Sequence, residues 1–228
     1  MNRPFTTVVL AMTADGKIAN VNRQAARFSS PADKAHLERQ ISLVDGVLFG
    51  AETLRAYGTT LPISAPELLA ARQQEHKPPQ PVHIVCSASG KLDPQLGFFS
   101  QPIPRWLLTT PTGAKYWQGI TEKLFQRVVV TEPTPLVKAK SINWVEVFSQ
   151  FAELGLRKLA ILGGGELVAS LLGMNLIDEM WLTLCPVIFG GATAPTPVGG
   201  VGLSPQQLAL LSVEQVEGEV FLHYRLQS

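Results

Sequence analysis

The chain has 228 residues, which is enough for one domain with a sizeable core. Hydrophobic residues make up 46% and charged residues 16% of it, a composition typical of globular rather than disordered proteins. Nineteen basic and eighteen acidic side chains leave a formal charge of +1, so electrostatics favour neither nucleic acid nor an anionic membrane as a partner. We expect a single domain over residues 1–228.

The two cysteines, Cys86 and Cys185, both occur in apolar runs. We expect two buried strand thiols, because two isolated cysteines have neither a metal-ligand spacing nor a disulfide framework. No apolar run approaches ~18 residues, and the N-terminal run meets a charge at Asp15 without resembling a cleavage site. The sequence therefore predicts a cytoplasmic protein without a metal site or a membrane span.

Strand-like and helix-like segments alternate along most of the chain. The segments that predict strands are Phe5–Met12, Gly46–Gly50, Val82–Ser87, Trp106–Thr109, Arg127–Thr131, Leu159–Leu162 and Glu179–Phe189. The segments that predict helices are Pro31–Ser42, capped by Ser30, then Ala51–Tyr57, Pro66–Glu75, Thr112–Trp117, Trp144–Leu154 and Gly165–Gly173. A closing hairpin is expected over Ser212–Glu217 and Val220–Leu226, and a mobile surface loop over Gly190–Pro205. This order predicts an α/β fold with a mostly parallel sheet, flanking helices and an antiparallel C-terminal hairpin.

Three consecutive glycines, Gly163 to Gly165, stand between a predicted strand and a predicted helix. Glycine lets the backbone approach a phosphate, and a helix N-terminus offers N–H groups and the positive end of its dipole. A tight turn without any ligand explains the same pattern. The turn differs from the dinucleotide fingerprint because Val168 replaces the third glycine, and from a P-loop because no Gly-Lys-Ser/Thr follows.

Three further strand ends carry small or hydroxyl residues. Asp15-Gly16-Lys17 follows the first strand, Gly50-Ala51-Glu52-Thr53 the second and Ser87 the third. Open α/β sheets bind ligands beyond the carboxyl ends of their strands, so these residues and the glycine turn predict one crevice that binds a nucleotide. Lys17 could there donate a proton or orient a polar substrate.

Five motifs occur in a fixed order along the chain: A-M-T-A-D-G-K-I-A, F-S-S-P, D-G-V-L-F-G-A-E-T, I-L-G-G-G-E-L-V and N-L-I-D-E-M-W-L-T-L-C-P-V-I-F-G-G. Together they resemble the pyrimidine reductases of riboflavin biosynthesis, which also form the C-terminal half of the bifunctional deaminase–reductase. The resemblance covers essentially the whole chain, so we expect no deaminase domain. It implies a dihydrofolate-reductase-like fold, a homodimer and NADPH as the cofactor.

The resemblance also implies roles for single residues. Lys17 would be the catalytic residue, facing the substrate beside the nicotinamide, with Asp15 and Ser29 near it. The residues implied to line NADPH are Gly50, Thr53, Ser87, Gly163, Gly164, Gly165, Glu166 and Leu167. The implied reaction reduces 5-amino-6-(5-phosphoribosylamino)uracil, or the 2,5-diaminopyrimidinone equivalent, to the ribitylamino product. Hydride would go to the sugar C1′, so the site must hold the donor and acceptor carbons close together.

Several substrate positions depart from the family. The positions concerned are Ile41, Tyr57, Ser64 and Leu162. The family has a glutamate at the position of Leu162, and basic residues that hold the substrate's phosphate at those of Ile41 and Ser64. We therefore expect Arg39 and Arg55 to bind this phosphate instead, since a phosphate site needs a nearby cation.

These departures leave other functions open. The chain could reduce another small heterocycle or imine, or bind NADPH without turnover as a regulatory relative. Dihydrofolate reduction would need an acidic side chain on the first long helix, for which Asp33 and Glu38 are the candidates. The choice between NADPH and NADH is also open, and Ser87 with Lys91 or Arg55 could bind a 2′-phosphate.

Overall fold

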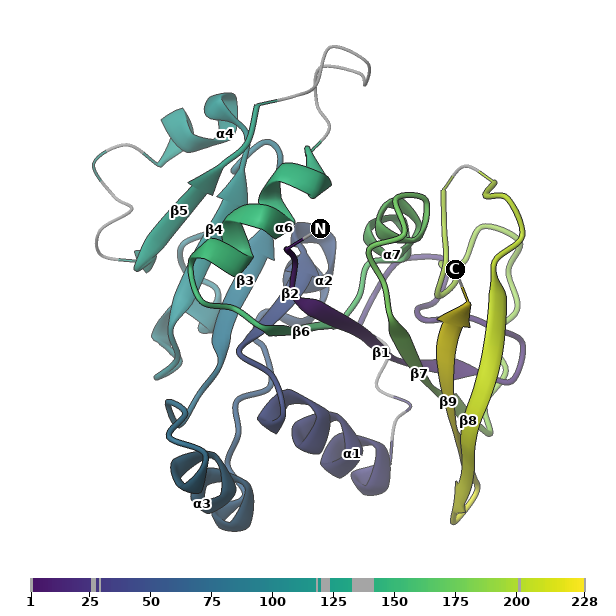
Figure 1. Cartoon of the computed structure of the whole chain (residues 1–228). Helices are drawn as coiled ribbons and strands as arrows, with labels where there is room; N and C mark the ends of the chain where they lie inside the picture. Colours follow the sequence, from purple (N-terminus) through teal and green to yellow (C-terminus); the bar gives the residue numbers. More distant parts are fainter. Residues whose placement is uncertain are drawn as a thin grey trace.

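A computed structural model describes residues 2–25, 28, 30–117, 119, 124–132, 142–200 and 202–227 of the chain. Strands and helices alternate until two long strands end the chain (Figure 1). The strands are β1 (Phe5–Thr13), β2 (Gly46–Gly50), β3 (Val82–Cys86), β4 (Arg105–Thr109), β5 (Arg127–Val130), β6 (Lys158–Ile161), β7 (Glu179–Cys185), β8 (Gln207–Val216) and β9 (Glu219–Gln227). The helices are α1 (Pro31–Ser42), α2 (Ala51–Tyr57), α3 (Pro66–Gln74), the 3-10 helix η1 (Gly97–Ser100), α4 (Pro111–Tyr116), α6 (Trp144–Glu153) and α7 (Gly165–Leu172).

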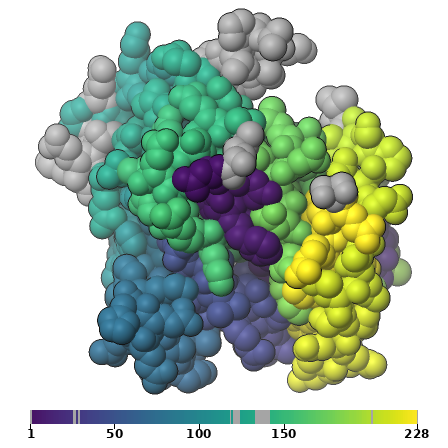
Figure 2. Space-filling view, in the orientation of Figure 1, coloured from purple at the N-terminus to yellow at the C-terminus, as the bar shows by residue number. Residues whose placement is uncertain are grey.

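The strands form a nine-stranded sheet in the order β5-β4-β3-β2-β6-β1-β7-β9-β8. The first seven strands in this order run parallel, and β9 runs antiparallel to both of its neighbours, β7 and β8. The predicted mostly parallel sheet with a C-terminal antiparallel hairpin is thereby confirmed. Because seven strands point the same way, their carboxyl ends meet along one edge of the sheet. The hairpin forms one flank of the molecule, in yellow and yellow-green in Figure 2.

Two hydrophobic clusters, one on each face of the sheet, form the core. The first packs α6 and α7 against the sheet, and the second packs α1, α2 and η1 against the other face. Strand β2 contributes to both, with Leu48 in the first cluster and Val47 and Phe49 in the second. Burial on both faces explains why this strand has a continuous apolar sequence. In the described part of the chain, no helix is long and apolar enough to cross a bilayer.

Two predicted strand boundaries are wrong by more than one residue. Strand β7 ends at Cys185 rather than Phe189, because Pro186 follows and cannot donate to the ladder of hydrogen bonds. Strand β8 begins at Gln207 rather than Ser212. Most of its residues are exposed on both faces, so its sequence lacks the alternation of polar and apolar residues that marks a strand.

The stretch Gly190–Pro205 was expected to be a mobile surface loop. It is irregular and mostly exposed, and parts of it pack against the rest of the fold. Ala194 is only 4% exposed, and the N–H of Gly199 donates to the carbonyl of Gly165 at 3.0 Å. This segment therefore packs against the start of α7.

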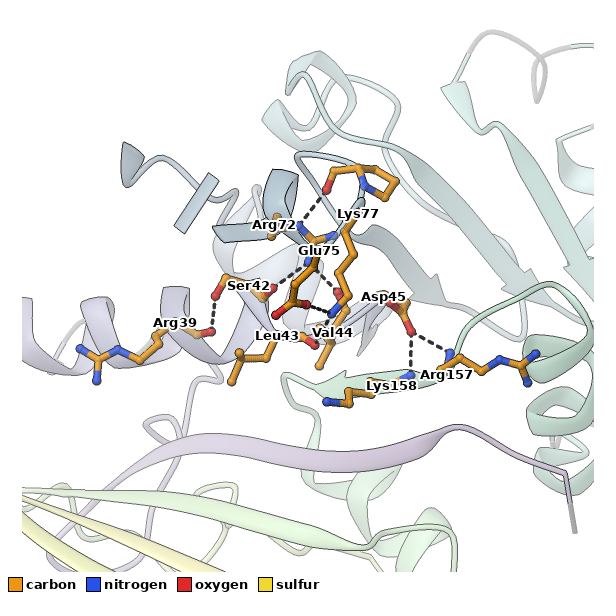
Figure 3. A network of polar contacts seen from close by, with 11 residues as sticks. Arg39, Ser42, Leu43, Val44, Asp45, Arg72, Glu75, Lys77, Arg157 and Lys158 are labelled. Carbon is orange, nitrogen blue, oxygen red and sulfur yellow. Dashed lines mark hydrogen bonds and ion pairs between the residues drawn. The ribbon is translucent and has the colours of Figure 1, made fainter. Parts of the chain in front are cut away.

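At the amino-terminal edge of the parallel strands, a buried arginine ties α3 to the end of α1 (Figure 3). Arg72 is 2% exposed, and its guanidinium donates to the carbonyls of Ser42, Val44 and Pro78 at 2.8 Å each. The carbonyls at a helix C-terminus lack partners within the helix, so this side chain satisfies groups that burial would otherwise leave unpaired.

The same edge is closed by a second polar contact (Figure 3). The Asp45 carboxylate accepts hydrogen bonds from the backbone N–H groups of Arg157 and Lys158 at 2.8 and 2.9 Å. One carboxylate thus joins the residue before β2 to the start of β6, more than a hundred residues further along the chain.

Candidate active site

A cavity of about 1560 Å³ opens at the carboxyl edge of the sheet. Sites for one small ligand usually occupy about 300–1,000 Å³, so this cavity has room for two ligands. Its walls come from the turns after β2, β3 and β6, the segment after β1, the first turns of α1 and the segment 192–200. The cavity lies where the strand ends predicted a crevice.

The glycine turn forms one wall of the cavity. Gly163 and Gly164 have φ angles of 122° and 83°, a backbone conformation that L-residues with side chains rarely adopt. Gly164 is the N-cap residue of α7 and offers no side-chain hydrogen bond to the N–H groups of the first turn, which have no partner within the helix. A Cβ on Gly163 would lie 3.6 Å from Oγ1 of Thr53, and the carbonyl of Gly163 accepts from the N–H of Gly50 at 3.2 Å. This cradle of N–H groups, a hydroxyl and bare Cα atoms fits a phosphate.

Gly165 lacks a side chain for a different reason. A Cβ at this position would stand 2.3 Å from the carbonyl oxygen of Thr196 and 3.1 Å from the nitrogen of Gly199. The third glycine is therefore required by the close packing of the segment 192–200. Sequence reasoning missed this segment as part of the site, because only its Gly and Pro content was visible and that content indicates a loop.

Other residues predicted to line the cofactor also border the cavity. They are Ser87 after β3 and Glu166 and Leu167 in the first turn of α7. Cys86, at the end of β3, borders it too and is half-buried, whereas Cys185 is buried as expected. Desolvation raises the pKa of the Cys86 thiol to about 12. A thiol with so high a pKa is no nucleophile near neutral pH.

The two arginines expected at the substrate's phosphate lie apart. Arg55 on α2 borders the cavity, where its guanidinium donates to the Glu52 carboxylate at 2.5 Å and to the Lys91 carbonyl at 2.6 Å. These contacts hold it beside the segment that follows β3. Arg39, in the last turn of α1, is exposed and is not among the residues that border the cavity.

The Asp15-Gly16-Lys17 turn is held by Thr13. The Thr13 hydroxyl donates to the Asp15 carboxylate at 2.6 Å and accepts from the N–H of Lys17 at 2.9 Å. Asp15 also accepts from the N–H groups of Phe189 and Gly190, at 3.2 and 2.7 Å. These bonds, chiefly that of Thr13, lower the pKa of Asp15 to about 2. Neither Asp15 nor Lys17 borders the cavity, although Ile18, the residue after Lys17, does.

Ser29 lies outside the described residues. Its neighbour Ser30 donates both its N–H, at 3.1 Å, and its hydroxyl, at 2.5 Å, to the carboxylate of Glu219, which is 3% exposed. The thiol of Cys185 lies 3.3 Å from the same carboxylate, and burial raises the pKa of this thiol. The start of α1 is thus fixed by the first residue of β9. Among the described residues, no group of three or more His, Cys, Asp and Glu could hold a metal ion.

Two charged residues in the first turn of α1 also border the cavity. Asp33 is 7% exposed and Lys34 is exposed. Sequence reasoning considered Asp33 only for dihydrofolate reduction and missed Lys34. The available signal was the Ser30-Pro31 helix start, because the helix that follows a strand of a parallel sheet begins near the carboxyl edge of that sheet.

The departures from the family have structural counterparts. Ile41 is fully buried in the second hydrophobic cluster. Ser64 donates its hydroxyl to the buried Glu38 carboxylate at 3.1 Å, so Glu38 connects α1 to the segment before α3 and does not border the cavity. Leu162 borders the cavity and packs against the second cluster. These three positions serve packing between elements.

Comparison with known proteins agrees with this architecture. A protein of Corynebacterium diphtheriae described as pyrimidine reductase-like superimposes with a TM-score of 0.81 at 19% identity, over 100% of this chain and 93% of that one. Dihydrofolate reductase from Enterococcus faecalis, complexed with NADP(H), superimposes with a TM-score of 0.53 at 12% identity, over 98% of this chain and 97% of that one. Both show the fold, and the dihydrofolate-reductase-like expectation is confirmed.

Sequence comparison identifies the family. The 2,5-diamino-6-ribosylamino-4(3H)-pyrimidinone 5′-phosphate reductase of Archaeoglobus fulgidus is 26% identical over 212 residues, covering 87% of each chain. The maize chloroplastic riboflavin biosynthesis protein PYRR is 28% identical over 223 residues, but this chain spans only 33% of its length. The model of the RibD C-terminal domain matches residues 4–222. The chain therefore belongs to the RibD C-terminal domain family.

Proposed function

We propose that this protein is an NADPH-dependent reductase that acts on 5-amino-6-(5-phosphoribosylamino)uracil, or on the 2,5-diaminopyrimidinone equivalent, and forms the ribitylamino product of riboflavin biosynthesis. The observation that carries the proposal is that one continuous cavity extends from the glycine turn to the first turn of α1. The activity for which the Archaeoglobus fulgidus relative is named supports it. We propose that residues 1–228 act as one reductase domain.

The cofactor side of the proposal rests on the glycine turn. The N–H groups at the start of α7, with Gly163, Gly164 and the Thr53 hydroxyl, would hold the pyrophosphate. Gly50, Ser87, Gly165, Glu166 and Leu167 would complete this wall. NADPH, when bound, supplies hydride. The protein's own task is to orient the nicotinamide and to exclude water.

We assign Arg55 to the 2′-phosphate of the cofactor rather than to the phosphate of the substrate. Its guanidinium lies against the Lys91 carbonyl, beside Ser87 and Ser89 at the end of β3. A cation and hydroxyl groups together suit a phosphate, and this choice favours NADPH over NADH. Replacing Arg55 with Gln should weaken NADPH binding while NADH binding changes little, which isothermal titration of both cofactors would measure.

The substrate would lie between the nicotinamide and the start of α1. The Asp33 carboxylate offers hydrogen-bond acceptors to the amino groups of a pyrimidine, and Lys34 offers a cation to the phosphate, with Arg39 further along the same helix. Lys17 would supply the proton, with Asp15 and Ser29 beside it. The Lys17 backbone is fixed by the Thr13 hydroxyl next to Ile18, which borders the cavity, and from this position the Lys17 side chain would reach toward the substrate.

The decisive experiment is an assay of NADPH oxidation with the phosphoribosylamino pyrimidine. We expect substrate-dependent loss of the reduced-nicotinamide absorbance and formation of the ribitylamino product. A flat trace with a protein that binds NADPH, as measured by titration, would contradict this substrate and leave a non-catalytic NADPH-binding relative. Turnover of another heterocycle or imine in the same assay would identify a related reductase.

Dihydrofolate reduction is a second candidate, because one observation favours it. That reaction needs an acidic side chain on the first long helix, and Asp33 on α1 is a buried carboxylate that borders the cavity. Glu38, the other candidate, is held by Ser64 away from the cavity. Dihydrofolate should therefore be included in the assay. Its reduction at a rate above that of the phosphoribosylamino pyrimidine would favour this second candidate.

We further propose a homodimer formed through β8. This strand lies at the end of the sheet and carries five exposed apolar residues: Leu208, Leu210, Leu211, Val213 and Val216. An exposed apolar edge strand readily pairs with a second chain. Sedimentation should give a dimer for the wild-type protein and a monomer for the double variant Leu210→Lys with Val213→Lys.

We also propose a cytoplasmic location. The two free cysteines suit it, because thiols stay reduced there.

A further inference from the structure

Two loops meet beside the cavity. We call residues 14–24 the β1 loop and residues 186–200 the β7 loop. Their backbones are joined directly, since the N–H of Ala14 donates to the carbonyl of Val187 at 2.8 Å and that of Ile18 to the carbonyl of Pro195 at 2.9 Å.

Asp15 makes a polar side-chain connection between these loops. It belongs to the β1 loop, and its carboxylate accepts from the N–H groups of Phe189 and Gly190 in the β7 loop. The Thr13 hydroxyl donates to the same carboxylate. These three hydrogen bonds occupy acceptor positions of the carboxylate, so Asp15 holds the loops together rather than binding the substrate directly. An exposed carboxylate that holds two backbone amides from 174 and 175 residues away orders the segments that it joins.

Each loop reaches a different side of the cavity. The β7 loop reaches the proposed cofactor side, where the carbonyl of Thr196 packs on Gly165 and the N–H of Gly199 donates to the Gly165 carbonyl. The β1 loop reaches the proposed substrate side, where Ile18 and Ala19 border the cavity. A continuous set of contacts therefore runs from the start of α7, through the β7 loop and Asp15, to the residues on either side of Lys17.

We propose that Asp15 is a positioning residue that couples the two binding sides, so that cofactor and substrate bind with positive cooperativity. A cofactor bound at the start of α7 would reduce the motion of the β7 loop. Because Asp15 is hydrogen-bonded to the β7 loop, the motion of the β1 loop would then be reduced as well. The substrate would then meet a loop that is already fixed, and its binding would cost less conformational entropy. The proposal rests on the proposed function, because it needs two ligands in one cavity.

The test uses NADP⁺, which lacks the hydride, together with the phosphoribosylamino pyrimidine. Titration of the wild-type protein with NADP⁺, alone and at saturating pyrimidine, should give a dissociation constant that falls by about 5-fold or more in the presence of the pyrimidine. In Asp15→Ala this factor should disappear, while each ligand alone still binds. Thr13→Ser keeps the hydroxyl and should retain the factor.

The structure offers a matched control. Asp45, at the opposite edge of the sheet, also accepts two backbone N–H groups from a distant segment. Asp45→Ala should lower the midpoint of urea unfolding as Asp15→Ala does, yet keep the cooperativity factor. A wild-type factor of unity, an unchanged factor in Asp15→Ala, or an equal loss in Asp45→Ala would each overturn the proposal.

A second measurement separates this inference from the proposed function. Hydrogen exchange of the ligand-free Asp15→Ala variant should accelerate at Phe189 and Gly190 and also at Ile18 and Gly199, the amides that lie further along the set of contacts. Acceleration confined to Phe189 and Gly190 would overturn the coupling. Failure of the wild-type protein to bind NADP⁺ would instead refute the proposed function and leave the exchange result to decide whether the loops are coupled.

Discussion

The two edges of the parallel sheet use the same kind of contact for opposite purposes. At the amino-terminal edge, Asp45 and Arg72 bind backbone groups and close the fold (Figure 3). At the carboxyl edge, Asp15 binds backbone groups of a distant loop in the same way, but a cavity of about 1560 Å³ stays open beside it. The difference teaches that a buried or tightly held charge is not by itself a sign of a ligand site. What distinguishes the carboxyl edge is the combination of bare glycines, an uncapped helix start and charged residues that border one cavity.

The largest effect should come from the closed edge. Arg72→Met removes three hydrogen bonds to buried carbonyls, so we expect a loss of about 3 kcal/mol in the free energy of unfolding. The dissociation constant of NADPH should stay the same. Urea unfolding and cofactor titration measure the two quantities. The control variant is Lys77→Met, at a neighbouring residue that donates one hydrogen bond to the Leu43 carbonyl. It should lower the free energy of unfolding far less. If folded Arg72→Met bound NADPH more weakly, the amino-terminal edge would affect the ligand site as well as stability, and the distinction between the two edges would be wrong.

At the carboxyl edge, Lys17→Met should lower turnover and leave stability nearly unchanged, whereas Arg72→Met should lower stability. If Lys17 supplies the proton, kcat should fall by ~10²-fold or more, equivalent to about 2.7 kcal/mol, with little change in stability or in NADPH binding. Steady-state kinetics with the proposed substrate and thermal unfolding measure this. Unchanged turnover would show that Lys17 is not catalytic and would favour a different proton donor.

His83 provides a prediction about pH at the closed edge. It lies near the start of β3, fully buried, with Nδ1 3.1 Å from the Thr60 hydroxyl, and burial lowers its pKa to about 3. The unfolded chain takes up this proton near pH 6.5, so the stability from the neutral ring is complete above that pH and is lost as the pH falls toward 3.

Between pH 7 and pH 5 the histidine should account for a loss of about 2 kcal/mol in the free energy of unfolding. Urea denaturation at both pH values measures the loss, and His83→Gln should reduce the difference between them. An equal difference in the variant would assign the pH dependence to other groups.

The smallest of the four effects concerns the glycine turn. In Gly165→Ala the new Cβ would meet the Thr196 carbonyl, so the β7 loop must shift. We expect NADPH to bind about 10-fold more weakly, or about 1.4 kcal/mol. Gly202→Ala is the control, because nothing lies within 4 Å of the Cβ that it would add. Unaltered binding in Gly165→Ala would show that the β7 loop adapts without affecting the cofactor.

Local signals explain what the sequence could predict. Helix α1 begins as expected because Ser30 and Pro31 set its start within a few residues, and β2 has its expected bounds because burial on both faces leaves a continuous apolar run. The glycine turn could also be identified, because its three consecutive glycines are a local signal in the sequence. The bonds of Asp15 to Phe189 and Gly190 could not be, because they join residues 174 and 175 positions apart and neither partner amide has a side-chain signature. The packing of Thr196 on Gly165 was hidden for the same reason.

The contact between Ser30 and Glu219 has a consequence for the order in which the protein is made. These residues are 189 positions apart, so a chain growing from its N-terminus lacks the partner of Ser30 until Glu219 has been made. The elements around the glycine turn, from β2 to α7, are all made before then. A ribosome-bound chain can therefore build the proposed cofactor wall early, whereas the start of α1 gains its final support only when β9 emerges. Ligands that bind the glycine turn could thus stabilise the nascent protein before it is able to hold a substrate.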